Sequence, residues 1–252
     1  MMRLATITPG QPEVFQAPQG EGPSAGTPCI FVRLSQCNLH CVWCDTPYTW
    51  NFEGSDFAHR RDKPGTPAKF DRASETVDLA IEDLVANLTA RDCRRLVITG
   101  GEPLLQQANV ARLCRALKNA DADWIIEIET NGTIAPRGDA LTLIDQFNVS
   151  PKLAHSGNPL ALRRKETLLV AYAEDPRAVF KFVVETAEDL AEVSDIAAAV
   201  GMPAHRIWLM PEGTDSDTLR ARTPWIKAAC AAHGYQFSDR LHIHAHGDTR
   251  GT

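Results

Sequence analysis

The stretch Leu96-Val-Ile-Thr-Gly-Gly-Glu-Pro103 decides the fold class, because a short β-branched run ends abruptly in turn-forming residues. Beyond this run, Val110, Leu113 and Leu117 recur at helical spacing and predict an amphipathic helix. A strand followed by a helix is the unit of a parallel α/β sheet, and successive units connect through right-handed crossovers.

The same pattern recurs along the chain. Strands are predicted at Cys29 to Leu34, Leu96 to Thr99, Trp124 to Glu129, Phe147 to Ser150, Val179 to Val184, Ile207 to Met210 and Leu241 to His244. Further helical faces combine Val77, Ile81, Leu84, Val85 and Leu88, and Leu190, Val193 and Ile196. Thr186 with Asp189 resembles a capping box, and Asp215 or Ser216 is expected to cap a helix running to Cys230. We therefore expect one α/β domain over residues 1–252, an open or incomplete barrel of about six parallel βα units.

Composition narrows the class of protein. The 252 residues are 44% hydrophobic and carry a net charge of −6, which argues against a nucleic-acid-binding surface. There is no apolar run of transmembrane length and no export signal, so a cytoplasmic protein without membrane contact is expected. Residues 51–74 are polar and contain Pro64, Gly65 and Pro67, which predicts a long inserted loop, either a lid or a mobile segment.

Three of the seven cysteines fall within eight residues, at Cys37, Cys41 and Cys44, directly after a predicted strand. The other four, Cys29, Cys93, Cys114 and Cys230, are scattered and expected to pack as small apolar side chains. A zinc site would need a fourth ligand, from His40 or from His242, His244 and His246 on one face of a strand. Three thiolates on a four-iron cluster would instead leave one iron open to an external molecule.

The C-x3-C-x2-C spacing, together with Thr99-Gly-Gly-Glu-Pro103, resembles the radical S-adenosylmethionine superfamily. The resemblance implies that the open iron chelates the methionine part of the cofactor. It also implies that Gly101, with Gly100 and Glu102 behind it, contacts the methionine amino group. Two alternatives stay open: another member of the superfamily, such as a glycyl-radical activase, and a zinc-stapled binding module.

Further motifs make the resemblance more specific. Gln19-Gly-Glu-Gly22, Gly26-Thr-Pro28, Phe31-Val-Arg-Leu34, Cys44-Asp-Thr46, Glu129-Thr-Asn-Gly132, Ser150-Pro-Lys152 and the closing segment from Arg240 to Gly251 together resemble the 7-carboxy-7-deazaguanine synthase family. This implies a lyase that converts 6-carboxy-5,6,7,8-tetrahydropterin to 7-carboxy-7-deazaguanine with loss of ammonia, in queuosine-type biosynthesis. It implies a 4Fe-4S cluster, S-adenosylmethionine and Mg²⁺, a reductant such as flavodoxin or ferredoxin, and a homodimer.

The resemblance also implies site residues. The cluster is expected on Cys37, Cys41 and Cys44, and Mg²⁺ on Thr46. S-adenosylmethionine is expected to contact Trp43, Cys44, Asp45, Gly101, Glu102, Ser150, Pro151, Lys152, Met210, Pro211 and Glu212. Substrate is expected at Pro18, Gln19, Gly20, Glu21, Arg33, Thr99 and Thr252, with residues 240–252 closing over it. Arg33 offers a planar, permanently charged fork for the substrate carboxylate. No side chain is expected to act as the key acid or base, because the cofactor supplies the radical.

Overall fold

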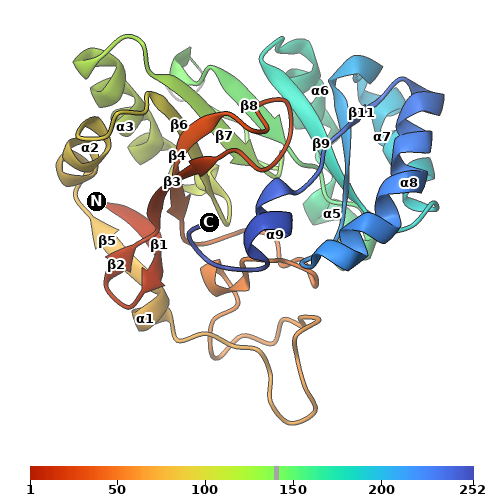
Figure 1. The fold of residues 1–252 in the computed structure, drawn as a ribbon, viewed down its shortest axis with the longest axis horizontal. Helices are drawn as coiled ribbons and strands as arrows, with labels where there is room; N and C mark the ends of the chain where they lie inside the picture. The colour runs from red at the N-terminus through yellow and green to blue at the C-terminus, as the bar shows by residue number, and fades with distance from the viewer. Residues whose placement is uncertain (139–141) are drawn as a thin grey trace.

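The computed structural model describes residues 1–138 and 142–252. In this part of the chain the strands form one sheet (Figure 1). They are β1 (Met2–Thr8), β2 (Gln11–Pro12), β3 (Val14–Pro18), β4 (Pro28–Leu34), β5 (Thr76–Leu79), β6 (Arg95–Gly100), β7 (Ile125–Thr130), β8 (Gln146–Val149), β9 (Ala178–Val184), β10 (Ile207–Pro211) and β11 (Gln236–Phe237). Strands β4, β6, β7, β8, β9, β10 and β11 lie parallel in that order, as expected for an unclosed (β/α) barrel.

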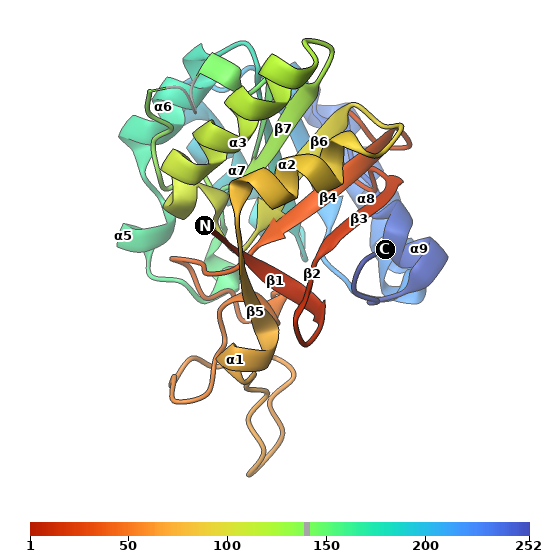
Figure 2. The same ribbon diagram turned by 90° about the vertical axis from the view of Figure 1, so that its left-hand side faces the viewer.

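The helices follow the strands as βα units require. They are α1 (Arg72–Glu75), α2 (Ile81–Thr89), α3 (Gln107–Ala120), α5 (Leu160–Arg163), α6 (Glu166–Glu174), α7 (Asp189–Val200), α8 (Ser216–His233) and α9 (Leu241–His246). Figure 2 shows α2 and α3 covering the outer face of β4 and β6. None of the helices in the described ranges is long and apolar enough to cross a lipid bilayer.

Strand β7 separates an apolar face of the sheet from a polar one. On β7, Ile126 and Ile128 are fully buried among the core side chains, whereas Glu127 and Glu129 alternate with them. Successive side chains of a strand point to opposite faces, so the glutamates lie on the opposite face of the sheet. There Glu127, which is fully buried, accepts hydrogen bonds from Ser24 Oγ (2.8 Å) and Asn148 Nδ2 (3.0 Å).

Most of the expected elements are confirmed. Six of the seven predicted strand runs correspond to β4, β6, β7, β8, β9 and β10, and the face formed by Val110, Leu113 and Leu117 lies on α3. Asp215 caps α8 by accepting a hydrogen bond from the Thr218 amide, whereas Ser216 is the first residue of the helix. The four scattered cysteines are free thiols, and three of them are buried, while Cys93 is half-buried against the core.

Two local predictions are wrong, and a third is half met. Residues 241–244 are helical, because β11 occupies the sheet edge beside β10 and Ile243 is buried from helix α9 instead. Val77 belongs to strand β5, which pairs with β1, so the helix begins only at Ile81. The capping box at α7 is half formed: the Asp189 carboxylate accepts the Thr186 amide, but no side chain caps the helix at Glu188.

The segment from residue 51 to residue 71 contains no helix and no extended strand, and it projects from the body of the molecule (Figure 1). A bridge between Phe52 and Phe70 closes its base. Inside it, the Lys69 ammonium donates to the Asn51 side chain (2.8 Å) and to the Phe57 carbonyl (2.6 Å). The loop is therefore held by its own polar contacts near the base.

Candidate active site

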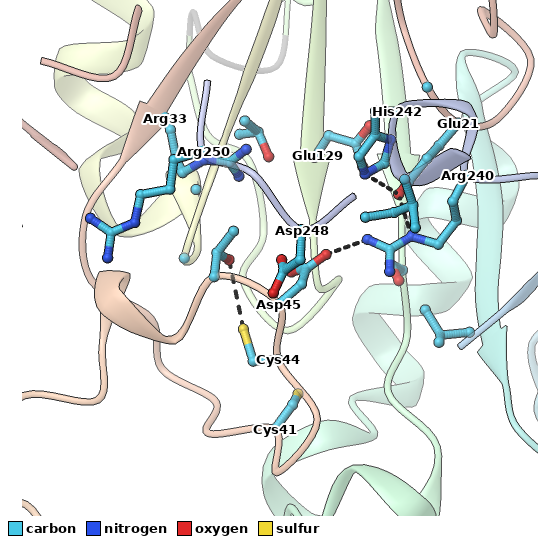
Figure 3. Close-up of a pocket in the computed structure, with 18 of the residues that line it drawn as sticks. Glu21, Arg33, Cys41, Cys44, Asp45, Glu129, Arg240, His242, Asp248 and Arg250 are labelled. Atoms are coloured by element: carbon cyan, nitrogen blue, oxygen red, sulfur yellow. Dashed lines mark hydrogen bonds and ion pairs between the residues drawn. The ribbon is translucent and has the colours of Figure 1, made fainter. Parts of the chain in front are cut away.

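The carboxyl ends of the parallel strands surround a cavity of ≈ 300 Å³ (Figure 3). It is lined by every predicted substrate residue, by the three clustered cysteines and by Thr46. Those residues are Pro18, Gln19, Gly20, Glu21, Arg33, Thr99, Thr252, Cys37, Cys41, Cys44 and Thr46. Among the predicted cofactor contacts, Trp43, Asp45, Gly101, Ser150, Lys152, Met210 and Glu212 also line it. Glu102, Pro151 and Pro211 do not.

Glu102 is held by the protein instead. Its side chain is fully buried and accepts hydrogen bonds from the amides of Leu104 (2.9 Å) and Asn131 (2.7 Å) and from the Thr130 hydroxyl. Burial raises the pKa of this carboxyl above its ordinary value. Glu102 therefore ties the turn after β6 to the end of β7.

The cysteine loop begins where β4 ends, and the turn after β6 presses directly against it. The Gly101 amide donates to the Leu34 carbonyl (3.1 Å), and the Glu102 amide donates to the Gln36 carbonyl (2.8 Å). A Cβ at Gly101 would lie 2.1 Å from the Gln36 oxygen and 2.9 Å from Cys37 Cβ. Gly100 and Gly101 are thus both required, because only residues without a side chain let this turn contact the backbone of the cysteine loop directly.

The three thiols fit an iron–sulfur cluster better than a single zinc ion. All three face the same cavity, and none is oxidised to a disulfide. Three thiols that line one cavity suit a cluster with one iron left open to a ligand, whereas a structural zinc ion would need a fourth protein ligand.

The three-histidine hypothesis also fails on geometry. Residues two apart on a helix point in widely different directions, so His244 lies on a different face of α9 from His242 and His246, and the three do not share a face. His242 approaches Glu21, with Nε2 3.9 Å from the carboxylate, and its ring packs against Gly20, where a Cβ would clash. His244 lies between the Ser216 hydroxyl (2.8 Å) and the Asp239 carboxylate (3.1 Å).

Burial keeps the uncomplexed thiols protonated. It raises the pKa of Cys41 to about 12, and it raises the pKa of Cys37 and of Cys44 as well. The Asn158 amide donates to Cys41 Sγ (3.3 Å) and so steadies this thiol. Binding to a metal would require each thiol to lose its proton, since the thiolate is the ligand.

Lys152 lines the cavity and, within the described residues, forms no ion pair with a carboxylate. The other lining lysine and arginine side chains, Arg33, Arg61, Lys181, Arg240 and Arg250, each form an ion pair with a carboxylate. The Lys152 ammonium instead donates to the Ser150 hydroxyl (2.8 Å) and lies 5.8 Å from the Trp43 ring centroid. Within the described part of the chain it is the lining cation without a carboxylate partner, so it is available to an anionic ligand.

Arg33 is oriented by a buried acid. Its Nε donates to Glu13 Oε1 (2.7 Å), and the Tyr48 hydroxyl donates to Glu13 Oε2 (2.9 Å). Glu13 is fully buried and lies just before strand β3, which pairs antiparallel with β4. Only one N–H of the Arg33 fork is used by Glu13, which leaves the terminal nitrogens for a ligand.

An ion-pair network crosses the middle of the cavity. The Lys181 ammonium, on β9, contacts Glu21 (2.5 Å) and Glu129 (2.9 Å), and the Gln19 amide lies 3.4 Å from Glu129. Burial by itself would lower the pKa of Lys181. The carboxylates of Glu129 and Glu21 outweigh this effect and hold the pKa of Lys181 above its ordinary value. Burial raises the pKa of Glu129. Polar groups at the strand ends are therefore positioned by one another before any ligand arrives.

The inserted loop and the C-terminal segment meet at the rim. Arg61 pairs with Asp248, and Arg60 pairs with Glu185 (2.6 Å), which follows β9. The Arg250 guanidinium lies over the Tyr48 ring, 3.6 Å from its centroid. These contacts bring residues 60–61 and 248–252 to the same side of the cavity.

Several lining residues were not assigned a role from the sequence, notably Glu13, Glu129, Lys181 and Arg240. Lys181 had a usable signal, because a lysine inside the apolar run of β9 is rarely buried without a partner. Glu129 alternates with Ile128 on a strand, which marks a second, polar face. Glu13 gave no such signal, since the strands on either side of it were themselves not predicted.

Comparisons with known proteins agree with this geometry. Residues 32–223 match the model of the radical S-adenosylmethionine superfamily. The 7-carboxy-7-deazaguanine synthase of Pyrobaculum aerophilum is 33% identical and covers 95% of both chains. That of Rhodopirellula baltica is also 33% identical, over 95% of this chain and 87% of the relative.

Comparison of the fold with solved structures indicates the same family. The crystal structure of QueE from Escherichia coli superimposes with a TM-score of 0.64 at 26% identity and covers 96% of this chain and 94% of that chain. The site motifs, the fold and the relatives therefore agree. The chain belongs to the 7-carboxy-7-deazaguanine synthase family of radical S-adenosylmethionine enzymes.

Proposed function

We propose that this protein is a lyase that converts 6-carboxy-5,6,7,8-tetrahydropterin to 7-carboxy-7-deazaguanine and ammonia, in the biosynthesis of queuosine-type nucleosides. The observation that carries the proposal is the joint lining of one cavity. Three thiols and Gly101 lie on it together with Arg33, Gln19 and Glu21, the polar groups expected at the substrate. A flat, anionic pterin needs this combination of a guanidinium with both donors and acceptors.

The cofactor side is built by the cysteine loop and the neighbouring strand ends. Cys37, Cys41 and Cys44 would hold the 4Fe-4S cluster, and the bare backbone of Gly101 would let the methionine end of S-adenosylmethionine lie close. Together, the cluster and S-adenosylmethionine would supply the one-electron radical chemistry of the reaction. Lys152 offers an unpaired charge to the methionine carboxylate.

The substrate side consists of residues that bind and orient. Arg33, steadied by Glu13, takes the substrate carboxylate, while Gln19 and Glu21 hydrogen-bond the pterin edge. Thr46, whose hydroxyl lies 3.6 Å from Cys44 Sγ, provides an oxygen ligand for Mg²⁺. These side chains hold the substrate carbon that bears the carboxylate in place and keep water out of the cavity.

Membership of the family supports three further proposals. We propose that the protein works as a homodimer, in the reducing cytoplasm that an oxygen-sensitive cluster requires. We also propose that it takes its electrons from a small carrier such as flavodoxin or ferredoxin. Light scattering on the purified holoenzyme measures the first property, and reduction of the cluster by each carrier measures the last.

The function is tested by anaerobic turnover. The reconstituted protein is incubated with 6-carboxytetrahydropterin, S-adenosylmethionine, Mg²⁺ and a reductant, and products are separated by liquid chromatography with mass detection. We expect 7-carboxy-7-deazaguanine in the full mixture and none when the cofactor or the reductant is omitted. Cofactor cleavage without a deazaguanine would show instead a radical enzyme of another kind, such as a glycyl-radical activase.

A further inference from the structure

Arg240 joins three segments that meet at the cavity. It follows β11 and directly precedes helix α9, and it is 5% exposed. Its Nε donates to Glu21 Oε1 (3.1 Å), its Nη1 donates to the Gly213 carbonyl (2.5 Å), and its Nη2 pairs with Asp45. Figure 3 shows the guanidinium between the two carboxylates.

The two carboxylates belong to opposite halves of the proposed site. Asp45 follows the last cysteine and is expected at the cofactor, whereas Glu21 lies on the loop between β3 and β4 and is expected at the substrate. One guanidinium therefore forms an ion pair with both carboxylates, through Nε to Glu21 (3.1 Å) and through Nη2 to Asp45.

The guanidinium of Arg240 also fixes the direction of each of its three contacts. Each of its three contacts uses a different nitrogen, so the guanidinium cannot turn toward one segment without changing its bonds to the others. A ligand that shifts Asp45 therefore changes the contacts of Arg240, and through them the position of Glu21. The two halves of the site are thus linked through one side chain.

We propose that Arg240 is a positioning residue that couples the two halves of the site, so that S-adenosylmethionine and the pterin each strengthen the binding of the other. The proposal rests on the proposed function and adds to it a coupling carried by one side chain. Thermodynamic linkage requires that the strengthening factor be the same in both directions. This keeps the radical precursor from being held firmly in a cavity that lacks its substrate.

Calorimetry on the anaerobic holoenzyme tests the coupling. Without a reductant neither ligand is consumed, so the dissociation constant of S-adenosylmethionine is measured with and without saturating 6-carboxytetrahydropterin. The ratio of the two constants is the coupling factor, and we expect at least about 5 for the natural protein, the lower end of known couplings. Arg240→Lys keeps the charge but loses the fork, and its ratio should fall to about 1.

Arg206→Lys is the matched control. Arg206 also donates three hydrogen bonds, to the carbonyls of Ala173, Asp175 and Ala178 in the connection from α6 to β9, but it does not line the cavity. Its variant should keep the coupling factor of the natural protein. Should Arg240→Lys not fold, Glu21→Gln removes the same link from the substrate side and should also bring the ratio toward 1.

The outcomes separate the two proposals. A natural protein that binds both ligands with a ratio of 1 overturns the coupling and leaves the proposed function standing. An Arg240→Lys variant with the full natural ratio overturns the role of Arg240. If the natural protein does not bind the pterin at any concentration, the proposed function itself fails.

Discussion

Gly101→Ala should disable the site while leaving the fold in place. Gly101 is the second glycine of the turn after β6, and its φ lies outside the left-handed region, so an alanine meets no backbone penalty there. The obstacle is contact alone. The new Cβ would lie 2.1 Å from the Gln36 oxygen and 2.5 Å from the Gln36 carbonyl carbon, atoms that no rotamer change can move.

The size of the effect follows from these distances. Ordinary contact begins at 3.4 Å, so the backbone of Gln36 must withdraw by about 1.3 Å, carrying Cys37 with it. Overpacking of this kind costs about 1–3 kcal/mol of the free energy of unfolding. A misplacement of about 1 Å at a reacting centre costs about 10²-fold in rate. Turnover should therefore fall about 10²-fold, whereas a loss of about 1–3 kcal/mol leaves most of a typical domain's stability of about 5–15 kcal/mol in place.

The control is Gly54→Ala in the inserted loop. Gly54 has a φ of +80° and no atom within 4 Å of a new Cβ, so the substitution costs about 1–2 kcal/mol of backbone strain without contact. Both variants should melt a few degrees early, but only Gly101→Ala should lose turnover and cofactor affinity. Thermal melts, iron content and anaerobic turnover are the measurements. A Gly101→Ala enzyme with natural iron content and turnover would refute the steric reasoning.

The remaining predictions concern the ligands of the site. Replacing Cys37, Cys41 or Cys44 with Ala should abolish the cluster absorbance and turnover together; an active, colourless variant would contradict the assigned ligands. Arg33→Ala should raise the KM for the pterin by about 10-fold or more, since a charge-assisted hydrogen bond is worth about 1.5–3 kcal/mol. The cluster spectrum should not change, and a changed spectrum would point to a structural role instead. Thr46→Ala should flatten the dependence of turnover on Mg²⁺ concentration, which a titration under anaerobic conditions measures.

The parallel strands could be predicted because each βα unit is a local pattern. An apolar run, a turn and a helical face all lie within about thirty residues, as for Leu96 to Thr99 and the α3 face that follows. The cysteine loop and Gly101 could be found for the same reason, since spacing within a short segment defines them. Features whose residues lie close together in the sequence can therefore be recognised from one sequence alone.

The antiparallel part could not be predicted in this way. Strand β1 pairs with β5 over seventy residues away, and β3 pairs with β4 across a glycine-rich loop, so neither strand has a local signature of its partner. Glu13, which orients Arg33, was missed along with them. The helical state of residues 241–246 depends likewise on β11 having taken the sheet edge. Burial, and not the alternation of Leu241 and Ile243 with histidines, decides that segment.

The most direct test of the central claim is the nitrogen balance of anaerobic turnover. Contraction of the pterin ring must release one ammonia for every 7-carboxy-7-deazaguanine formed, so both products are measured in the same time course. We predict a ratio of 1 at every time point and no ammonia when S-adenosylmethionine is withheld. Ammonia without the deazaguanine, or cofactor consumption without either product, would contradict the account.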